Sequence, residues 1–185
     1  MLLDESQWSP FLSDIAQSFI EMQKVQAGKE LFDYFSENKN NLHIFSSTDF
    51  PDDFGNAGID KAGVNIYINT NGNSLIPTTQ GYDLENSPLW INLAHEMAHR
   101  RDYIQRGRRA CNANTFYGLP DTDRVACHWE NVMRGQSGLP LRTCYNSMDN
   151  PLLLEILGEG SIPNWSNFSR FFSIVENGLF KPYKY

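Results

Sequence analysis

Three residues suited to hydrolytic chemistry lie close together in the middle of the chain. His95, Glu96 and His99 form a His-Glu-x-x-His pattern. Residues four apart lie one turn apart on the same face of a helix, so both imidazoles can reach one tetrahedral zinc ion, with Glu96 beside the open position. Zinc lowers the pKa of its water toward about 7, and the neighbouring carboxylate can then take a proton from that water. The pattern therefore predicts a hydrolytic zinc site.

A catalytic zinc site usually has three protein ligands, so one more must come from elsewhere in the chain. The acidic candidates are Asp102, Asp121, Asp123 and Glu130. Asp102 lies one turn beyond His99 on the same helix, where its reach around the same ion is poor, so we expect a helix-surface acid or an acid that contacts a ligand. Asp123, Ala126 and Glu130 share one face of a second helix. The small Ala126 allows close approach, so either Asp123 or Glu130 can be the third ligand.

Further motifs follow in a characteristic order. They are Asp123 three residues before Ala126, Glu130-Asn131-x-x-Arg134, and Gly138-Leu139-Pro140-Leu141-Arg142-x-x-Tyr145. Together with the His-Glu-x-x-His pattern they cover about 93–145, and this combination resembles the NleD-type family of bacterial effector zinc metalloproteases. The layout is also similar to a minimal version of the clostridial neurotoxin light chains.

The resemblance implies a role for each matching residue. It makes Asp123 the third zinc ligand, Glu130 a group behind the ligands, and Arg142 and Tyr145 stabilisers of the oxyanion, while Glu96 acts as general base and then general acid. A fixed guanidinium or phenol aimed at growing negative charge typically contributes about 3 kcal/mol to the reduction of the barrier. Asp123 departs from the glutamate usual in this layout. Because its shorter side chain must bring its helix closer, Glu130 stays the alternative ligand.

The function expected from the resemblance is a zinc-dependent endopeptidase. It implies a monomeric secreted or injected bacterial effector or toxin domain that leaves the cell without a signal peptide and acts in the host cell cytoplasm. The implied substrates are host signalling proteins such as MAP kinases. Two alternatives remain, a zinc hydrolase of a cell-wall amide and a non-catalytic zinc-stabilised binding module. The second would dock through an arginine patch, formed by Arg100, Arg101, Arg106, Arg108 and Arg109. The plainer interpretation of this patch is a solvated helix end whose cations suit the helix dipole.

Length and charge limit these interpretations. The chain has 185 residues, 41% of them hydrophobic, so we expect one domain over 1–185 with its motif-bearing core at about 60–150. The net charge of −7 disfavours nucleic acid and anionic membrane as partners. The acidic start of the chain does not fit a secretory signal, and no apolar run is long enough to span a bilayer. Three cysteines without a Cys-x-x-Cys pair indicate reduced thiols.

The surrounding pattern predicts the elements that must position these residues. Ser87 as cap and Pro88 at the first position predict a helix that ends at Gly107. A second helix, which Asp121 or Thr122 could cap, is expected to end at Gly135. Opening helices over 11–35 are expected to break at Gly28. A further helix is expected over 164–177.

Alternating residues predict strands at 42–45 and 64–69, with a loop over 71–85. The fold class expected is α+β, a small zincin-like metalloprotease domain with a mixed sheet beside the His-Glu-x-x-His helix. The strand over 64–69 could be the edge against which an extended substrate pairs. His43 and His128 are expected to be structural or surface residues, because no partner stands at ligand spacing.

Overall fold

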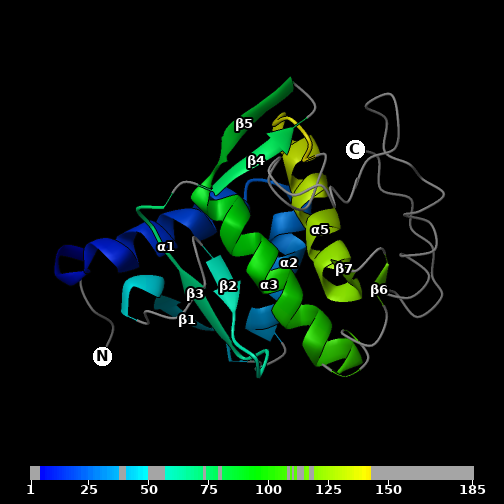
Figure 1. Ribbon diagram of the computed structural model, residues 1–185. Coiled ribbons are helices and arrows are strands. Elements are labelled where there is room, and N and C mark those ends of the chain that lie inside the picture. The colour runs from blue at the N-terminus through cyan, green and yellow to red at the C-terminus, as the bar shows by residue number, and fades with distance from the viewer. Residues whose placement is uncertain are drawn as a thin grey trace.

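The computed structural model describes residues 5–37, 41–49, 57–72, 74–78, 81–107, 109, 111, 115–116 and 119–142. These residues form a small fold of mixed helices and sheet, as the α+β class requires (Figure 1). The helix expected over 164–177 lies outside the described residues. The elements in chain order are η1 (Glu5–Gln7), α1 (Pro10–Met22), α2 (Gln26–Glu37), β1 (His43–Ser46), η2 (Ser47–Asp49), β2 (Ala57–Ile59), β3 (Asn65–Ile68), β4 (Ser74–Thr78), β5 (Gly81–Ser87), α3 (Leu89–Arg106), β6 (Thr115–Phe116), β7 (Leu119–Pro120) and α5 (Asp121–Ser137).

The three-stranded sheet has β3 at its centre. β1 pairs with β3 in parallel, with His43 opposite Asn65, and β2 pairs with β3 antiparallel, with Ala57 opposite Ile68. The expectation that the strand over 64–69 is a free edge is therefore wrong, since β3 has a neighbour on both sides. Alternation reveals which face of a strand is buried, but it does not reveal how many neighbours the strand has.

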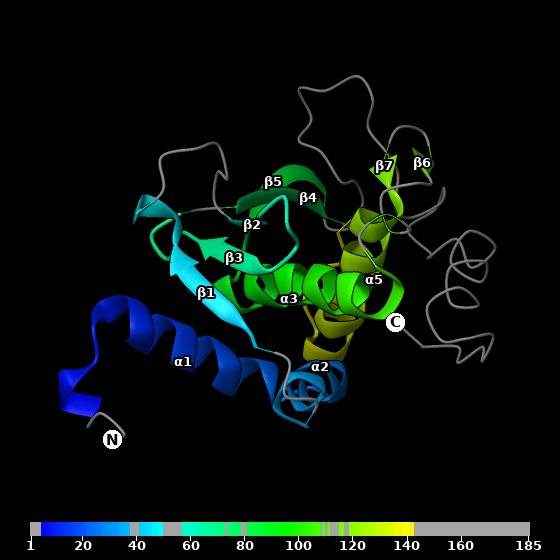
Figure 2. The ribbon, with the colours of Figure 1, turned by 90° about the horizontal axis from the view of Figure 1, so that it is seen from below.

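α3 is the central helix of the packing. It contacts α5 on one side, β2 and β3 on another, and α1 and α2 as well (Figures 1 and 2). Its apolar side chains at Ile91, Leu93, Ala94, Met97 and Ala98 are buried because neighbours cover the helix on several faces. Among the described helices, none has the length and apolar composition that a membrane crossing requires.

The opening helices break before the glycine that was expected to interrupt them. α1 ends at Met22, and Gly28 lies inside α2. A Cβ atom built on Gly28 would lie only 2.0 Å from the carbonyl oxygen of Met22. Gly28 is therefore required for close approach of the backbone and does not end a helix.

The start of α3 also differs from the expectation. Ser87 was expected to cap the helix, but it is the last residue of β5, and Pro88 stands at the cap position without a side-chain hydrogen bond. The Ser87 hydroxyl instead accepts a hydrogen bond from the Arg134 guanidinium at 2.7 Å. The expected end is confirmed, because Gly107 has φ 77° and its N–H donates to the carbonyl of Tyr103.

The segment over 71–85 was expected to be a loop, but it contains most of an antiparallel hairpin. β4 pairs with β5, with Ser74 opposite Ser87 and Ile76 opposite Glu85. Polar residues dominate this stretch, so it lacks the apolar alternation that indicates a half-buried strand. The hairpin leads directly into the first turn of α3 (Figure 1).

α5 continues past Gly135, its expected end, to Ser137, and a glycine in the left-handed region follows it. Gly138 has φ 72°, the N–H of Leu139 donates to the carbonyl of Arg134, and the N–H of Gly138 donates to the carbonyl of Gly135. These two hydrogen bonds form a Schellman motif. The motif reverses the chain, so that Arg142 returns to the side of α5.

Gly138→Ala tests this turn. A Cβ atom at Gly138 meets nothing within 4 Å, so only the left-handed backbone opposes the substitution. We expect the free energy of unfolding to fall by about 1–2 kcal/mol, measured by urea denaturation. Gly138→Asn should lose less, because asparagine tolerates this conformation. An alanine variant as stable as the wild type would contradict the assignment.

His128 should make the metal-free protein sensitive to acid. Burial lowers its pKa to about 3, well below the value of about 6.5 in the unfolded chain. Between these two values the unfolded state binds a proton that the folded state does not, so stability falls as pH falls.

Between pH 7 and pH 5 this linkage amounts to about 2 kcal/mol. Over that interval the free energy of unfolding of His128→Gln, measured by urea denaturation, should therefore fall by about 2 kcal/mol less than that of the wild type. His43→Gln is the matched control, since His43 is exposed. Equal losses in the wild type and the His128 variant would show that this histidine is not responsible.

Candidate functional site

α3 places His95, Glu96 and His99 in the interior of the protein. Their exposed fractions are 7%, 6% and 4% respectively. The imidazole rings of His95 and His99 have centroids 4.9 Å apart and planes inclined at 72°. One helical turn therefore brings the two rings edge to face, as the spacing of four residues predicts.

The first turn of α5 contacts His99 at both ring nitrogens. Nδ1 lies 2.9 Å from Oγ1 of Thr122, and Nε2 lies 3.4 Å from Oδ1 of Asp123. α3 and α5 pack against each other, and Ala98 of α3 and Ala126 of α5 are fully buried in the core. Sequence reasoning considered Thr122 only as a helix cap and missed its contact with His99.

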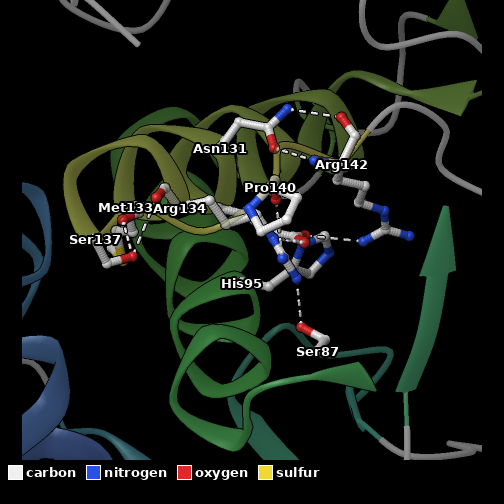
Figure 3. A network of polar contacts seen from close by, with 9 residues as sticks. Ser87, His95, Asn131, Met133, Arg134, Ser137, Pro140 and Arg142 are labelled. Atoms are coloured by element: carbon white, nitrogen blue, oxygen red, sulfur yellow. Dashed lines mark hydrogen bonds and ion pairs between the residues drawn. The ribbon is translucent and has the colours of Figure 1, made fainter. Parts of the chain in front are cut away.

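Glu130, two turns further along α5, contacts the other histidine. Its Oε2 atom lies 3.0 Å from Nδ1 of His95 and accepts a hydrogen bond from the Arg142 guanidinium at 2.9 Å. Its Oε1 atom accepts from Nε of Arg134 at 2.9 Å. Arg134 extends this buried network to the hydroxyl of Ser87 (Figure 3). Both oxygens of Glu130 are therefore engaged within the protein.

Asn131 holds the backbone of Arg142. Its side-chain amide donates to the carbonyl of Arg142 at 3.0 Å, and its carbonyl oxygen accepts the N–H of Arg142 at 2.8 Å (Figure 3). Arg142 also forms an isolated antiparallel bridge with Thr78 at the end of β4. Sequence reasoning noted Asn131 within the Glu-Asn-x-x-Arg motif but assigned it no role. Two neighbouring residues of α5, Glu130 and Asn131, thus hold the side chain and the backbone of one arginine.

Burial and neighbouring charges shift the acids and bases of this group in different directions. Burial raises the pKa of Glu96 to about 7, although the charges of His95 and Arg142 oppose the shift. Burial also acts to raise the pKa of Glu130, but Arg142, His95 and Arg134 together outweigh it and hold that pKa well below its usual value.

His99 is shifted toward its neutral form. Burial, followed by the charges of His95 and Arg142, lowers the pKa of His99 well below its usual value. A neutral imidazole at neutral pH is the form that binds a metal ion.

His95, Cys127 and Glu130 form a buried group that could hold a metal ion. One ligand atom from each lies within 4.8 Å of the others. Cys127 was expected only to be a reduced thiol, and its place one turn before Asn131 on α5 brings it here. Burial raises the pKa of the Cys127 thiol far above neutral pH. The described residues thus hold two candidate sets of metal ligands: this group of three, which includes His95, and the pair formed by His99 and Asp123, whose nearest ligand atoms are 3.4 Å apart.

Asp102, the remaining acid considered on α3, does not join either set. It is 1% exposed and forms an ion pair with Arg106, which corrects the expectation of a surface acid. Its backbone carbonyl also contacts the Cys111 thiol. Tyr145, expected to stabilise the oxyanion, lies outside the described residues.

The arginines after the motif are used within the fold. Arg100 donates to the carbonyl of Gly63 at 2.8 Å, and the Arg101 guanidinium lies over the rings of Tyr34 and Trp129, 5.2 Å and 4.6 Å from their centroids. Arg106 pairs with Asp102. Three arginines of the patch therefore have partners within the fold, while Arg109 is exposed.

Comparison with known proteins leaves the chain without a family assignment. Neither the protein-family models, nor the curated proteins, nor the solved structures contain a match to this sequence or fold.

Proposed function

We propose that this chain is a zinc-dependent endopeptidase, with His95, His99 and Asp123 as zinc ligands. The observation that carries the proposal is the 3.4 Å separation between Nε2 of His99 and Oδ1 of Asp123. Two ligand atoms at normal zinc distances and a tetrahedral angle are about 3.4 Å apart. A charge-assisted hydrogen bond would be shorter, at about 2.7–2.9 Å. The pair is therefore spaced as ligands of one ion.

The charges around Glu130 favour Asp123 as the third ligand. Two guanidiniums, those of Arg134 and Arg142, already hold the Glu130 carboxylate, and a zinc ion beside them would meet their repulsion. Cys127 would have to lose a proton that burial retains. Glu130 instead suits the common arrangement in which a carboxylate accepts the Nδ1 proton of a histidine that binds metal through Nε2.

The remaining residues suit peptide hydrolysis. Zinc, when bound, supplies Lewis acidity toward the scissile carbonyl and the attacking water. Glu96, adjacent in sequence to His95 and with its pKa raised to about 7, can accept a proton and later return it to the leaving amine. The charge of Arg142 lowers the pKa of both Glu96 and His99, which supports a role for its guanidinium in stabilising an oxyanion.

The substrate follows only from the resemblance of the motifs over 93–145. We propose a protein substrate, a host signalling protein such as a MAP kinase, cleaved in the host cytoplasm by a secreted or injected effector. Tyr145 completes the proposed machinery as a second oxyanion stabiliser. These assignments depend on the motif order quoted for the NleD-type family.

Zinc content should distinguish the two sets of metal-binding neighbours. We expect His99→Ala and Asp123→Asn to weaken zinc affinity by more than roughly 10- to 100-fold, the cost of losing a residue that only hydrogen-bonds a zinc ligand. Cys127→Ala should keep one zinc ion per chain. Each variant is dialysed against a chelator of defined affinity, and zinc is measured by mass spectrometry. Circular dichroism checks folding. Loss of zinc from Cys127→Ala with retention in Asp123→Asn would place the metal in the other group.

Peptidase activity should depend on Glu96. Glu96→Gln removes the proton acceptor but preserves side-chain size, so we expect activity to fall about 10²- to 10⁴-fold with zinc retained. The measurement is the appearance of new protein amino termini in eukaryotic cell lysate. Glu37→Gln, an exposed change on α2, is the matched control. Zinc-loaded wild type that produces no new termini would contradict a peptidase and favour the cell-wall hydrolase or the binding module.

A further inference from the structure

His99 is held on both edges of its ring by consecutive residues of α5. Oγ1 of Thr122 lies 2.9 Å from Nδ1, and Oδ1 of Asp123 lies 3.4 Å from Nε2. Thr122 is 2% exposed and His99 is 4% exposed, so water has little access to this contact. The hydroxyl of Thr122 is therefore a fixed partner for Nδ1.

The tautomer of His99 decides whether Nε2 can bind a metal ion. A neutral imidazole carries one proton, on either Nδ1 or Nε2, and the nitrogen without the proton supplies the lone pair. A threonine hydroxyl can accept a hydrogen bond from Nδ1–H, and this places the lone pair on Nε2, the nitrogen that faces Asp123. The hydrogen bond also limits rotation of the ring.

We propose that Thr122 is a positioning residue that fixes His99 with its proton on Nδ1 and its lone pair toward the zinc position. The proposal rests on the zinc site of the proposed function. Thr122 would hold His99 in the same way that Glu130 holds His95. Each supplies an oxygen 2.9–3.0 Å from Nδ1 of its histidine. The two partners differ in charge, because one is a carboxylate and the other a neutral hydroxyl.

The Thr122 hydroxyl is not needed to cap α5. α5 begins at Asp121, so Thr122 already lies inside the first turn, and its hydroxyl is directed to α3. Valine has the same branched shape and the same restricted χ1 angle in a helix. Thr122→Val therefore removes the hydroxyl with little change in shape, and Thr122→Ser keeps the hydroxyl and removes the methyl group.

The test is the dissociation constant for zinc, measured by competition with a fluorescent chelator at neutral pH. We expect Thr122→Val to weaken zinc binding about 10- to 100-fold, and Thr122→Ser to bind within about threefold of the wild type. The d–d absorption spectrum of the cobalt-substituted protein should change in the valine variant only. Thr122→Ala, which also lacks the hydroxyl, replaces the valine variant if that variant does not fold.

Zinc binding requires no substrate, so the outcomes separate this proposal from the proposed function. A valine variant that binds zinc as tightly as the wild type would overturn the role of Thr122, even if its metal-free form were less stable. Wild type that binds zinc but shows no Glu96-dependent cleavage would overturn the peptidase. The role of Thr122 would then still stand or fall with the zinc affinity of the valine variant. Wild type that binds no zinc would overturn both.

Discussion

The buried carboxylate of Glu130 is the contact on which the rest of the arrangement depends. It is 2% exposed and joins three parts of the chain, with hydrogen bonds to Arg134 on α5, to Arg142 beyond the end of α5, and to His95 on α3. Burying an ion costs several kcal/mol unless well-placed partners offset the loss of water. Removing Glu130 would leave the guanidiniums of Arg134 and Arg142 without the carboxylate that they share. The three segments must therefore be positioned together.

α5 contacts the two histidines of α3 in reverse order. The earlier residues of α5, Thr122 and Asp123, meet the later histidine of α3, and the later residue, Glu130, meets the earlier histidine. Such an order requires helices that run in opposite directions. The two helices pack against each other, and each carries a fully buried alanine. The short side chain of Asp123 reaches to 3.4 Å from Nε2 of His99.

Local features of the sequence predicted part of this arrangement. The stretch over 88–106 was expected to be helical, and α3 begins one residue later, because capping, proline placement and apolar spacing act within a few residues. The strands over 42–45 and 64–69 were found as β1 and β3. The hairpin over 74–87 was not predicted, because β4 lacks an alternating pattern. The partner of the Ser87 hydroxyl was not predicted either, because Arg134 lies 47 residues away in the chain.

The sequence by itself determined that His95 and His99 would share one helix face with Glu96 beside them, because that outcome depends only on the 3.6-residue period of a helix. Only the tertiary structure decided which acid faces which histidine. Asp123 and Glu130 share a face of α5 and look equivalent in sequence, but one lies beside Nε2 of His99 and the other is surrounded by guanidiniums. Their surroundings come from residues distant in the chain, which no local pattern describes.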